Sequence, residues 1–323
     1  MERLDEFMAR ANAAYYATRD PFQDFTTAPE IAQAFGELLG LWAAVVWEAM
    51  GRPAPVLLAE LGPGRGTLMS DALRAVAKAS PAFRAAMRVH LVEASPRLRA
   101  EQARRVPEAT WHESAGALPP GPMILLANEF LDALPIRQLV RRDGAWTERF
   151  VADGRLVERP VAYDGEDAPE GAVVEVGEAG RELVAALAAR LARDGGAALF
   201  LDYGPERGAP GESLQAIRAG RFADPFETPG EADLTAHVDF AALARAARAA
   251  GATAWGPVPQ GMFLVRLGLF QRTDRLARGQ PPARAAALIE AAQRLAEPAR
   301  MGRLFKALCV AHTALPAPPG FEP

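Results

Sequence analysis

Residues 56–66 read Val56-Leu57-Leu58-Ala59-Glu60-Leu61-Gly62-Pro63-Gly64-Arg65-Gly66, a short apolar run that leads into a glycine-rich turn. Such a run is typical of a buried strand of a parallel sheet. The glycines let the chain bend sharply and let a ligand approach the backbone. Residues 67–79 have the pattern of the following helix, whose first N–H groups have no partner within the helix. The stretch therefore predicts a nucleotide-type binding turn at the end of a central strand.

The spacing of the glycines separates this turn from two better-known nucleotide turns. A dinucleotide turn of the form G-x-G-x-x-G would need a glycine at position 67, where the chain has Thr67. A phosphate-binding loop would need a lysine after its last glycine, and no lysine follows Gly66. The remaining form, acid-x-G-x-G-x-G, is typical of class I methyltransferases, in which Glu60 would organise the loop near the methionine end of S-adenosyl-L-methionine.

A second carboxylate is expected beside this turn. Glu93 ends the next predicted strand, residues 88–93, and can accept hydrogen bonds from both ribose hydroxyls of an adenosyl group. The C-terminal ends of neighbouring parallel strands meet at one edge of a sheet, where such sheets bind ligands. We expect the cofactor S-adenosyl-L-methionine to be bound by Glu60, Gly62, Gly64, Gly66, Thr67, Leu68, Glu93, Ser95 and Thr27.

Strand-like and helical patterns alternate along most of the chain, which predicts right-handed crossovers and a mostly parallel α/β sheet. The expected strands are residues 56–61, 88–93, 109–112, 122–128 and 196–203, and the expected helices are residues 67–79, 96–105, 181–194, 240–250 and 282–296. Residues 252–255 and 263–267 are expected to be the last strands, as an antiparallel pair. A further helix opens at Ala28 and continues to Val46 by its apolar spacing, with Thr27 and Glu30 as a capping box.

The predicted organisation is a Rossmann-like α/β core with additions. The expected parts are an N-terminal helical cap or lid at 1–55, the core at 56–136 and 172–270, an antiparallel insertion at 137–171, and a C-terminal helical segment and tail at 271–323. Hairpin signals at Asp143-Gly144 and Asp153-Gly154 support the insertion. Residues 164–171 are expected to be an exposed loop, and residues from Pro316 onward a frayed tail. The insertion is placed to dock a protein or to form a homodimer.

Composition excludes several classes of function. Lys and Arg total 36 against 40 Asp and Glu, so the net charge of −4 gives no support for nucleic-acid binding. The single cysteine, Cys309, excludes an internal disulfide, and the histidines show no metal-ligand spacing. The most apolar early stretch, residues 38–50, is too short to cross a bilayer and contains Glu48. We therefore expect a cytoplasmic protein with no metal and no membrane insertion.

Longer strings around the turn resemble one known family. Besides residues 60–69, they are residues 15–16, 20–22, 24–30, 35–37, 91–96, 127–135, 202–204, 229–240, 260–261 and 301–306. Together they resemble the MidA-type class I S-adenosyl-L-methionine-dependent methyltransferases, formerly a domain of unknown function, which include the mitochondrial complex I assembly methyltransferase and its bacterial relatives. The resemblance implies a class I fold, the same cofactor and arginine methylation of a protein substrate. For the mitochondrial relative that substrate is a respiratory complex I subunit.

Two positions depart from the family pattern. The family has a longer glycine-containing stretch where this chain has Gln23, and a histidine where this chain has Pro205 after Asp202-Tyr203-Gly204. These departures keep open the alternative of a low-activity cofactor-binding assembly or interaction factor. A small-molecule methyltransferase is a further alternative.

Asn128 and Glu129 follow the predicted strand 122–128, where class I enzymes place residues that contact the methyl acceptor. Methyl transfer from a sulfonium is an in-line displacement, so the enzyme mainly positions the acceptor and excludes water. A guanidinium is a poor nucleophile, and a carboxylate beside it can orient it and hold its charge. We expect Glu129 to be this catalytic partner, with Asn128 beside it and Asp132 as a second choice. The alternative is that Glu129 caps a helix or forms a structural ion pair.

Several other residues have two interpretations each. A lid over the cofactor is one interpretation for residues of the N-terminal region, and local capping or packing is the other. The residues of that region are Asp24, Thr26, Thr27 and Glu30. Tyr15 and Tyr16 either pack or stack on adenine. Asp202 and Tyr203 end the strand 196–203, which is a site position by geometry. His237 and Asp239 either face the site or serve as a core histidine and a helix cap.

Overall fold

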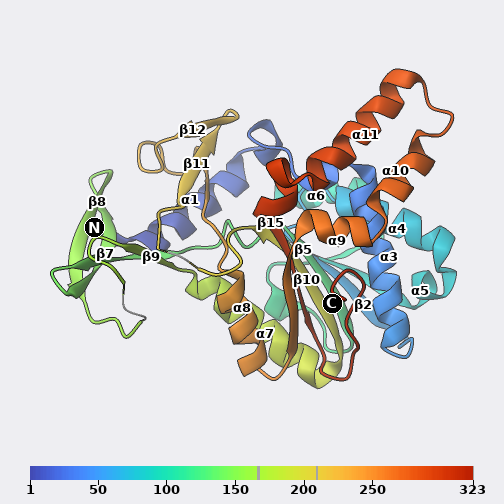
Figure 1. Cartoon of the computed structure of the whole chain (residues 1–323), viewed down its shortest axis with the longest axis horizontal. Coiled ribbons are helices and arrows are strands. Elements are labelled where there is room, and N and C mark those ends of the chain that lie inside the picture. The colour runs from blue at the N-terminus through green and yellow to red at the C-terminus, as the bar shows by residue number, and fades with distance from the viewer. Residues whose placement is uncertain (166–167, 209, 323) are drawn as a thin grey trace.

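The computed structural model describes residues 1–165, 168–208 and 210–322 (Figure 1). A central sheet contains β2 (Val56–Leu61), β3 (Met87–Val92), β4 (Thr110–His112), β5 (Met123–Asn128), β10 (Gly196–Tyr203), β14 (Thr253–Pro259) and β15 (Phe305–Ala311). The order of these strands is β14-β15-β10-β5-β2-β3-β4. Five strands, from β10 to β4 in that order, run parallel, and β15 runs antiparallel to β10 and β14. The sheet is mostly parallel, as the sequence predicts.

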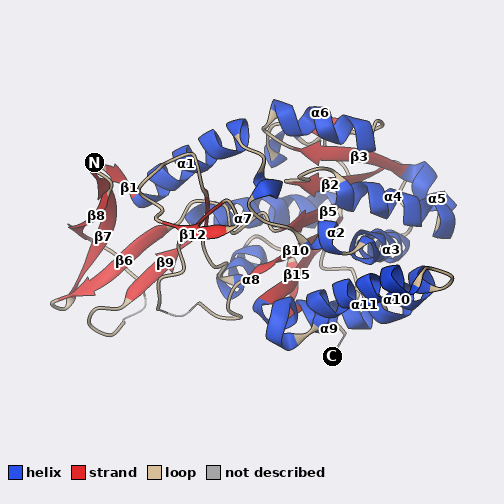
Figure 2. Ribbon diagram, turned by 90° about the horizontal axis from the view of Figure 1, so that it is seen from above, coloured by secondary structure: helices blue, strands red, loops and turns tan. Residues whose placement is uncertain are grey.

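Helices cover both faces of this sheet (Figure 2). One layer contains α3 (Gln33–Ala49), α4 (Thr67–Ala79), α5 (Pro81–Ala86), α9 (Gln260–Arg266), α10 (Leu269–Ala277) and α11 (Pro282–Ala296). The other layer contains α7 (Glu178–Asp194) and α8 (Phe240–Ala249), and α6 (Pro96–Arg105) connects β3 to β4. Leu58 packs into the first layer and Leu57 into the second. Because β2 is buried on both faces, its sequence is a continuous apolar run.

Helices α3 and α4 pack unusually closely because α3 has glycines at the contact. A Cβ added to Gly36 would lie 2.8 Å from the Cβ of Asp71, and one added to Gly40 would lie 2.6 Å from the Cα of Ala72. No larger side chain fits at either position without moving one of the helices. This contact fixes α4, and with it the glycine turn that precedes α4, against the core.

A second part of the molecule lies beside the central sheet, at the left of Figure 1. It contains β1 (Glu2–Arg3), α1 (Leu4–Thr18), β6 (Arg137–Arg142), β7 (Ala145–Ala152), β8 (Arg155–Val161), β9 (Val173–Val176), β11 (Gln215–Arg218), β12 (Arg221–Ala223) and β13 (Asp233–Thr235). The predicted hairpin turns are present, with Asp143 and Asp153 both at φ +49°. The antiparallel sheet is larger than the expected insertion 137–171, because β9 pairs with β6 and β1 pairs with β7. Residues 166 and 167 of the loop expected at 164–171 lie outside the described residues.

The N-terminal region differs from the single helical cap expected at 1–55. The predicted helix from Ala28 to Val46 is interrupted at Ala32, which is extended with φ −142° and ψ 116° between α2 (Ala28–Ile31) and α3. The capping box is wrong, because Thr27 makes no side-chain cap hydrogen bond and Glu30 accepts one from the Thr67 hydroxyl instead. Helix α3 belongs to the core layer, so only the region before it, including the short helix η1 (Pro21–Gln23), can cover a site.

The C-terminal region also differs from the expectation. Residues 263–267, predicted to be a strand, lie in α9 and at its end, and β15 takes the place beside β10. The core therefore includes residues beyond the expected boundary at 270. The tail from Pro316 is packed rather than frayed: Phe321 is 6% exposed and its ring centroid lies 5.2 Å from that of Phe263. The remaining described elements are the short helical turns η2 (Ala115–Ala117) and η3 (Pro298–Gly302).

Two kinds of feature are absent from the described residues, a membrane-spanning helix and a metal-binding cluster. Within them, no helix is both long enough and apolar enough to cross a membrane. In the same residues, no group of three or more His, Cys, Asp or Glu side chains is arranged to hold a metal ion.

Candidate active site

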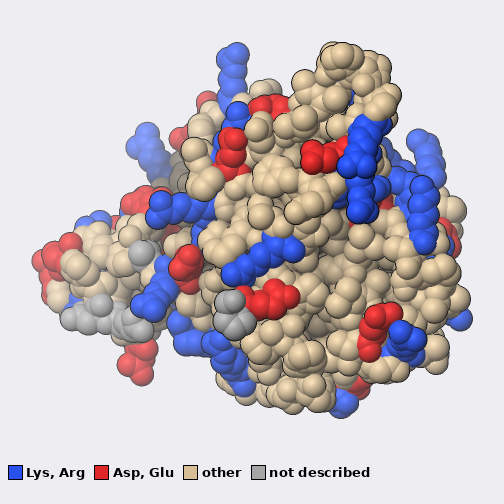
Figure 3. All heavy atoms as spheres, turned by 45° about the vertical axis from the view of Figure 1, so that its right-hand side comes forward, with Lys and Arg blue, Asp and Glu red and all other residues tan. Residues whose placement is uncertain are grey.

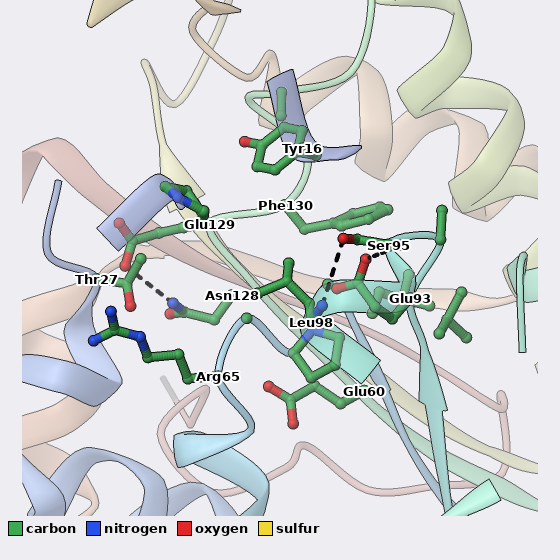
Figure 4. A pocket seen from close by; sticks show the side chains of 18 of the residues that line it. Tyr16, Thr27, Glu60, Arg65, Glu93, Ser95, Leu98, Asn128, Glu129 and Phe130 are labelled. Atoms are coloured by element: carbon green, nitrogen blue, oxygen red, sulfur yellow. Dashed lines mark hydrogen bonds between the residues drawn. The ribbon is translucent and has the colours of Figure 1, made fainter. Parts of the chain in front are cut away.

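A cavity of about 600 Å³ lies at the C-terminal ends of the parallel strands β2, β3, β4 and β5 (Figure 4). Helix α1 and residues 21–30 cover it. Ten of the residues predicted for the site line this cavity: Thr27, Glu60, Gly62, Gly64, Thr67, Leu68, Glu93, Ser95, Asn128 and Glu129. Gly66 and Asp132 do not belong to the described lining. The volume is within the range of small-ligand sites, which is about 300–1,000 Å³.

The glycine turn has the backbone conformation that its composition predicts. Gly62, Gly64 and Gly66 have φ values of +58°, +53° and +79°, a region that side chains with a Cβ rarely adopt. Gly66 is the N-cap residue of α4, and a Cβ on it would lie 3.5 Å from the side chain of Gln102, so this position faces α6. A Cβ on Gly62 would lie 2.7 Å from the ring of Phe130, and one on Gly64 would lie 2.7 Å from the ring of Phe22. The turn is therefore bare backbone with an aromatic ring against each of its first two glycines.

Glu60 is a buried carboxyl with an unused oxygen. Its side chain is 3% exposed, and within the described residues its Oε2 has no hydrogen-bond partner. Burial raises the pKa of Glu60 to about 8, although a backbone hydrogen bond from Met69 acts in the opposite direction. A buried polar atom without a partner is costly, so this oxygen indicates a missing donor in the cavity.

Glu93 is held in place by two donors. The Ser95 N–H donates to its Oε1 at 2.8 Å, and the Gln102 amide donates to its Oε2 at 3.3 Å. The same Gln102 amide donates to the carbonyl of Gly64 at 2.8 Å, so it connects Glu93 to the glycine turn. The Ser95 hydroxyl accepts a bond from Leu98 N–H at 3.5 Å as the N-cap of α6. Burial raises the pKa of Glu93.

Glu129 has a strained backbone and faces the cavity. Its φ is +50°, which non-glycine residues rarely adopt. Its Oε1 accepts from the Ala28 N–H at 2.8 Å and from the Asn128 amide at 3.0 Å. Glu129 thus does cap a helix, but the helix is α2, which belongs to the cover of the cavity. Burial raises the pKa of Glu129 to about 7. In the described part of the chain, the Asn128 Oδ1 is buried without a partner.

Three further carboxyls lie behind Glu129. Asp202 accepts the N–H groups of residues 130, 131 and 132 at 3.1, 2.8 and 3.2 Å, so it anchors the turn that carries Glu129. Burial raises the pKa of Asp202 and of Asp233 to about 6, and burial together with these neighbouring charges raises that of Asp132 well above its usual value. Among the described residues, none of the four carboxyls forms an ion pair with Lys or Arg. The cavity therefore adjoins a buried acidic group without a direct ion-pair partner among the described residues, although the charge of Arg294 acts to lower the pKa of Glu129.

Some of the remaining candidate residues line the cavity and others lie outside its described lining. Tyr16 lines the cavity and donates to Asp233 at 2.7 Å, whereas the buried Tyr15 donates to Asp24, outside the cavity wall. Thr27 and Glu30 line the cavity, but Asp24 and Thr26 are not part of its described lining. Tyr203 donates to Thr235 at 2.6 Å and lies outside that lining. His237 and Asp239 line another cavity, and Asp239 caps α8 by accepting from Ala242 at 2.9 Å.

Sequence reasoning missed several residues of the cavity wall, among them Arg65, Phe22, Phe130 and Glu113. Arg65 lies 4.4 Å above the ring of Phe22 and donates to Asp20 at 3.1 Å, so it joins the glycine turn to the cover. Phe130 directly follows Glu129, and Glu113 follows β4 at the same edge of the sheet. The position of Glu113 after a parallel strand was a usable signal. The contact between Phe22 and Gly64 joins segments far apart in sequence, so the sequence carried no signal for it.

Comparisons with known proteins give the family. A family model described as "Putative S-adenosyl-L-methionine-dependent methyltransferase" matches residues 38–258. The chain is 35% identical to "Protein arginine methyltransferase NDUFAF7 homolog, mitochondrial" of Drosophila melanogaster, over 96% of this chain and 80% of the relative. The chain belongs to this methyltransferase family. The human protein named "Protein arginine methyltransferase NDUFAF7, mitochondrial" is 33% identical, over 94% of this chain and 78% of its own length.

A solved methyltransferase structure agrees with this assignment. The structure, from Burkholderia thailandensis and bound to S-adenosyl-homocysteine, has a TM-score of 0.83 and 28% identity, over 98% of this chain and 89% of that chain. The class I α/β fold and the MidA-type resemblance are confirmed, and the methyltransferase uses S-adenosyl-L-methionine. The expected cytoplasmic location is wrong, because the curated relatives are named as mitochondrial proteins.

The cavity of this methyltransferase fits that cofactor. Glu60 holds a buried oxygen without a partner in the described structure, and Glu93 presents a carboxylate already fixed by two donors. S-adenosyl-L-methionine carries an amine, a sulfonium and a ribose diol, which are the positive and hydrogen-donating groups that such oxygens accept.

Proposed function

We propose that this methyltransferase acts on arginine side chains of a protein substrate. The observation that carries the proposal is the acidic group beside the cavity, made of Glu129, Asp132, Asp202 and Asp233. Buried carboxyls without a counter-ion attract a cation, and a guanidinium is cationic at any physiological pH. The names of the curated relatives support the same substrate class.

We assign Glu129 to the guanidinium and Glu60 and Glu93 to the cofactor. The cofactor supplies an electrophilic methyl group on a sulfonium. Glu129 uses one oxygen to hold the Ala28 N–H, so its second oxygen is the one available to a guanidinium nitrogen. The unpartnered Asn128 Oδ1 is suited to accept a second guanidinium N–H. Fixed in this way, one nitrogen can take the methyl group as the methyl–sulfur bond breaks and a neutral thioether leaves. The nitrogen gives up one proton to the second oxygen of Glu129, so that the product keeps a single positive charge.

Glu129 must be ionised to hold a guanidinium. Because its pKa is raised to about 7, the carboxylate forms only as the pH rises through that value in the free enzyme. We expect kcat/KM to rise with pH with a midpoint near pH 7, and kcat to rise with a lower midpoint because a bound cation favours the carboxylate. Glu129→Gln removes this rise and lowers kcat by about 100-fold, within the range for a catalytic carboxylate.

The experiment uses a labelled methyl donor and an extract of the source cells. Labelled protein that yields methylarginine on hydrolysis is the expected result for the wild type. Glu129→Gln should lose the label and keep the cofactor Kd, while the exposed Glu182→Gln control should keep both. Label confined to small molecules would favour a small-molecule methyltransferase, and cofactor binding without any labelled product would favour a binding factor.

We further propose the finer features that the resemblance and the fold suggest. The protein substrate is a respiratory complex I subunit, as for the mitochondrial relative in the family. The antiparallel part at 137–171 docks that substrate or a second copy of this chain. A native mass measurement and a cross-link from this part to the labelled substrate would separate these two uses.

A further inference from the structure

Tyr16 enters the cavity from α1 with its ring fixed in place. Its hydroxyl donates to Asp233 at 2.7 Å, and Asp233 is 3% exposed. Its ring meets the ring of Tyr15 edge-on, with centroids 5.2 Å apart and an interplanar angle of 80°. The side chain of Tyr16 is half-buried and lines the cavity. One part of this ring is therefore held by the protein while another part borders the cavity.

The ring lies beside the same acidic group as Glu129. Burial, followed by the charges of Asp233 and Asp132, raises the pKa of Tyr16. Burial also raises the pKa of Asp132, and the charge of Glu129 adds to this shift. Figure 4 shows Tyr16 with Glu129 and Phe130 in the part of the cavity away from Glu60. Asn12 holds α1 above this part, because its amide donates to the carbonyls of Ala133 and Leu234 at 2.9 and 2.8 Å.

Carboxylates alone attract any cation, whereas an aromatic face distinguishes between cations. A guanidinium is planar and weakly hydrated, so it stacks readily on an aromatic ring. An ammonium is a compact, strongly hydrated charge that loses more hydration free energy on leaving water. A fixed ring beside a carboxylate therefore favours arginine over lysine at equal charge.

We infer that Tyr16 is a specificity-determining residue whose ring face holds a planar guanidinium against Glu129 and disfavours an ammonium group. Asp233 is then a positioning residue that acts through the Tyr16 hydroxyl. This inference rests on the proposed arginine methylation and adds the residue that selects the acceptor.

The test compares two cofactor analogues that carry either a guanidine or a primary amine, tethered in place of the transferable methyl group. Calorimetry gives the Kd of each analogue, and S-adenosyl-homocysteine gives the binding of the cofactor portion alone. We expect the wild type to bind the guanidine analogue about tenfold more tightly than the amine analogue. Tyr16→Leu should reduce that ratio to about two or less and leave the Kd of S-adenosyl-homocysteine unchanged.

Two matched variants make the result specific. Phe25→Leu makes a similar aromatic-to-leucine change in the same cavity wall, away from the Tyr16–Asp233 hydrogen bond, and should keep the wild-type ratio. Tyr16→Trp restores an aromatic face and should recover most of the ratio. If Tyr16→Leu fails to bind S-adenosyl-homocysteine, Tyr16→Met provides the same loss of the ring with a flexible side chain that fills irregular gaps.

The outcomes separate this inference from the proposed function. A wild type that shows no preference for the guanidine analogue contradicts arginine as the acceptor. A wild-type preference that persists in Tyr16→Leu or Tyr16→Met overturns the role of Tyr16 alone. An equal loss of the ratio in Phe25→Leu would also overturn it, because the effect would then belong to the cavity as a whole.

Discussion

Glu129 combines backbone strain with a buried charge. A left-handed conformation costs a non-glycine residue about 1–2 kcal/mol, and the φ of +50° at Glu129 persists because Asp202 holds the three N–H groups that follow it. This conformation aims the carboxyl at the cavity and at the Ala28 N–H of the cover. Strain at this position therefore serves the site rather than the stability of the fold.

Glu60 provides a test of whether a buried carboxyl serves the site at the expense of stability, at a position without backbone strain. Its carboxyl is buried and lacks a partner for Oε2 in the described residues, so Glu60→Gln removes a group that is costly to ionise. We expect the ligand-free Tm at pH 8.5 to rise by roughly 1–2 °C, which corresponds to about 1 kcal/mol for a chain of 323 residues. The Kd for S-adenosyl-L-methionine should rise at least tenfold. Scanning calorimetry and titration calorimetry measure the two effects, and a lower Tm with an unchanged Kd would assign Glu60 to the fold alone.

Residue-level prediction worked where the chemistry was local in sequence. Glu60 and Glu93 each end a strand, and both line the cavity, because one strand and its turn are enough to place them. Asp132 seemed equivalent to Glu129 in the sequence, but its side chain joins the buried acidic group outside the cavity lining. Tyr16 reaches the site only through the packing of α1 on β13, which no local pattern encodes.

At the scale of elements, the sequence placed all five parallel strands of the central sheet and missed the antiparallel strand β15. Residues 263–267 and residues 305–311 are both short apolar runs, and such runs do not distinguish a buried helix from a buried strand. In the structure, the first run lies mainly in α9 and the second is β15. The difference arises from tertiary pairing, because β10 offers β15 a free edge in the centre of the core.

Strand β15 should be required for soluble folding, whereas the tail after it should only raise the Tm. A truncation after Arg303 removes β15 with its buried residues 306–311 and exposes the edge of β10, so we expect insoluble protein. A truncation after Leu315 removes only the packed tail with Phe321, so we expect soluble protein with a Tm lowered by a few degrees. Soluble yield and circular dichroism measure both variants. Equal solubility of the two would show that β15 is peripheral.

At the scale of the whole molecule, ligand-free stability should depend on pH through the buried carboxyls. The folded-state pKa of Glu60 is about 8 and that of Glu129 about 7, both above the usual value of 4.5. The folded protein thus binds more protons than the unfolded chain up to those pH values, so stability falls as pH rises through them. The lowered pKa of His90, about 4, acts in the opposite direction only below about 6.5.

We therefore expect the free energy of unfolding to decrease from pH 6.5 to pH 8.5 at constant salt. Urea denaturation at the two pH values measures this change. The double variant Glu60→Gln, Glu129→Gln should show a clearly smaller decrease, because it lacks two of the groups that lose protons in this interval. Stability that rises between pH 6.5 and pH 8.5 in the wild type would contradict the raised pKa values of these buried carboxyls.

The position of β15 has a consequence for how the protein is made on the ribosome. The strands that carry the glycine turn, Glu93 and Glu129 all precede β10, and chains begin to fold from their N-terminal part during synthesis. The edge of β10 nevertheless stays open until more than one hundred later residues, including β15, have been translated. Throughout that interval the nascent chain carries a finished cofactor turn beside an unpaired strand edge, which makes it a natural client of chaperones that shield such edges.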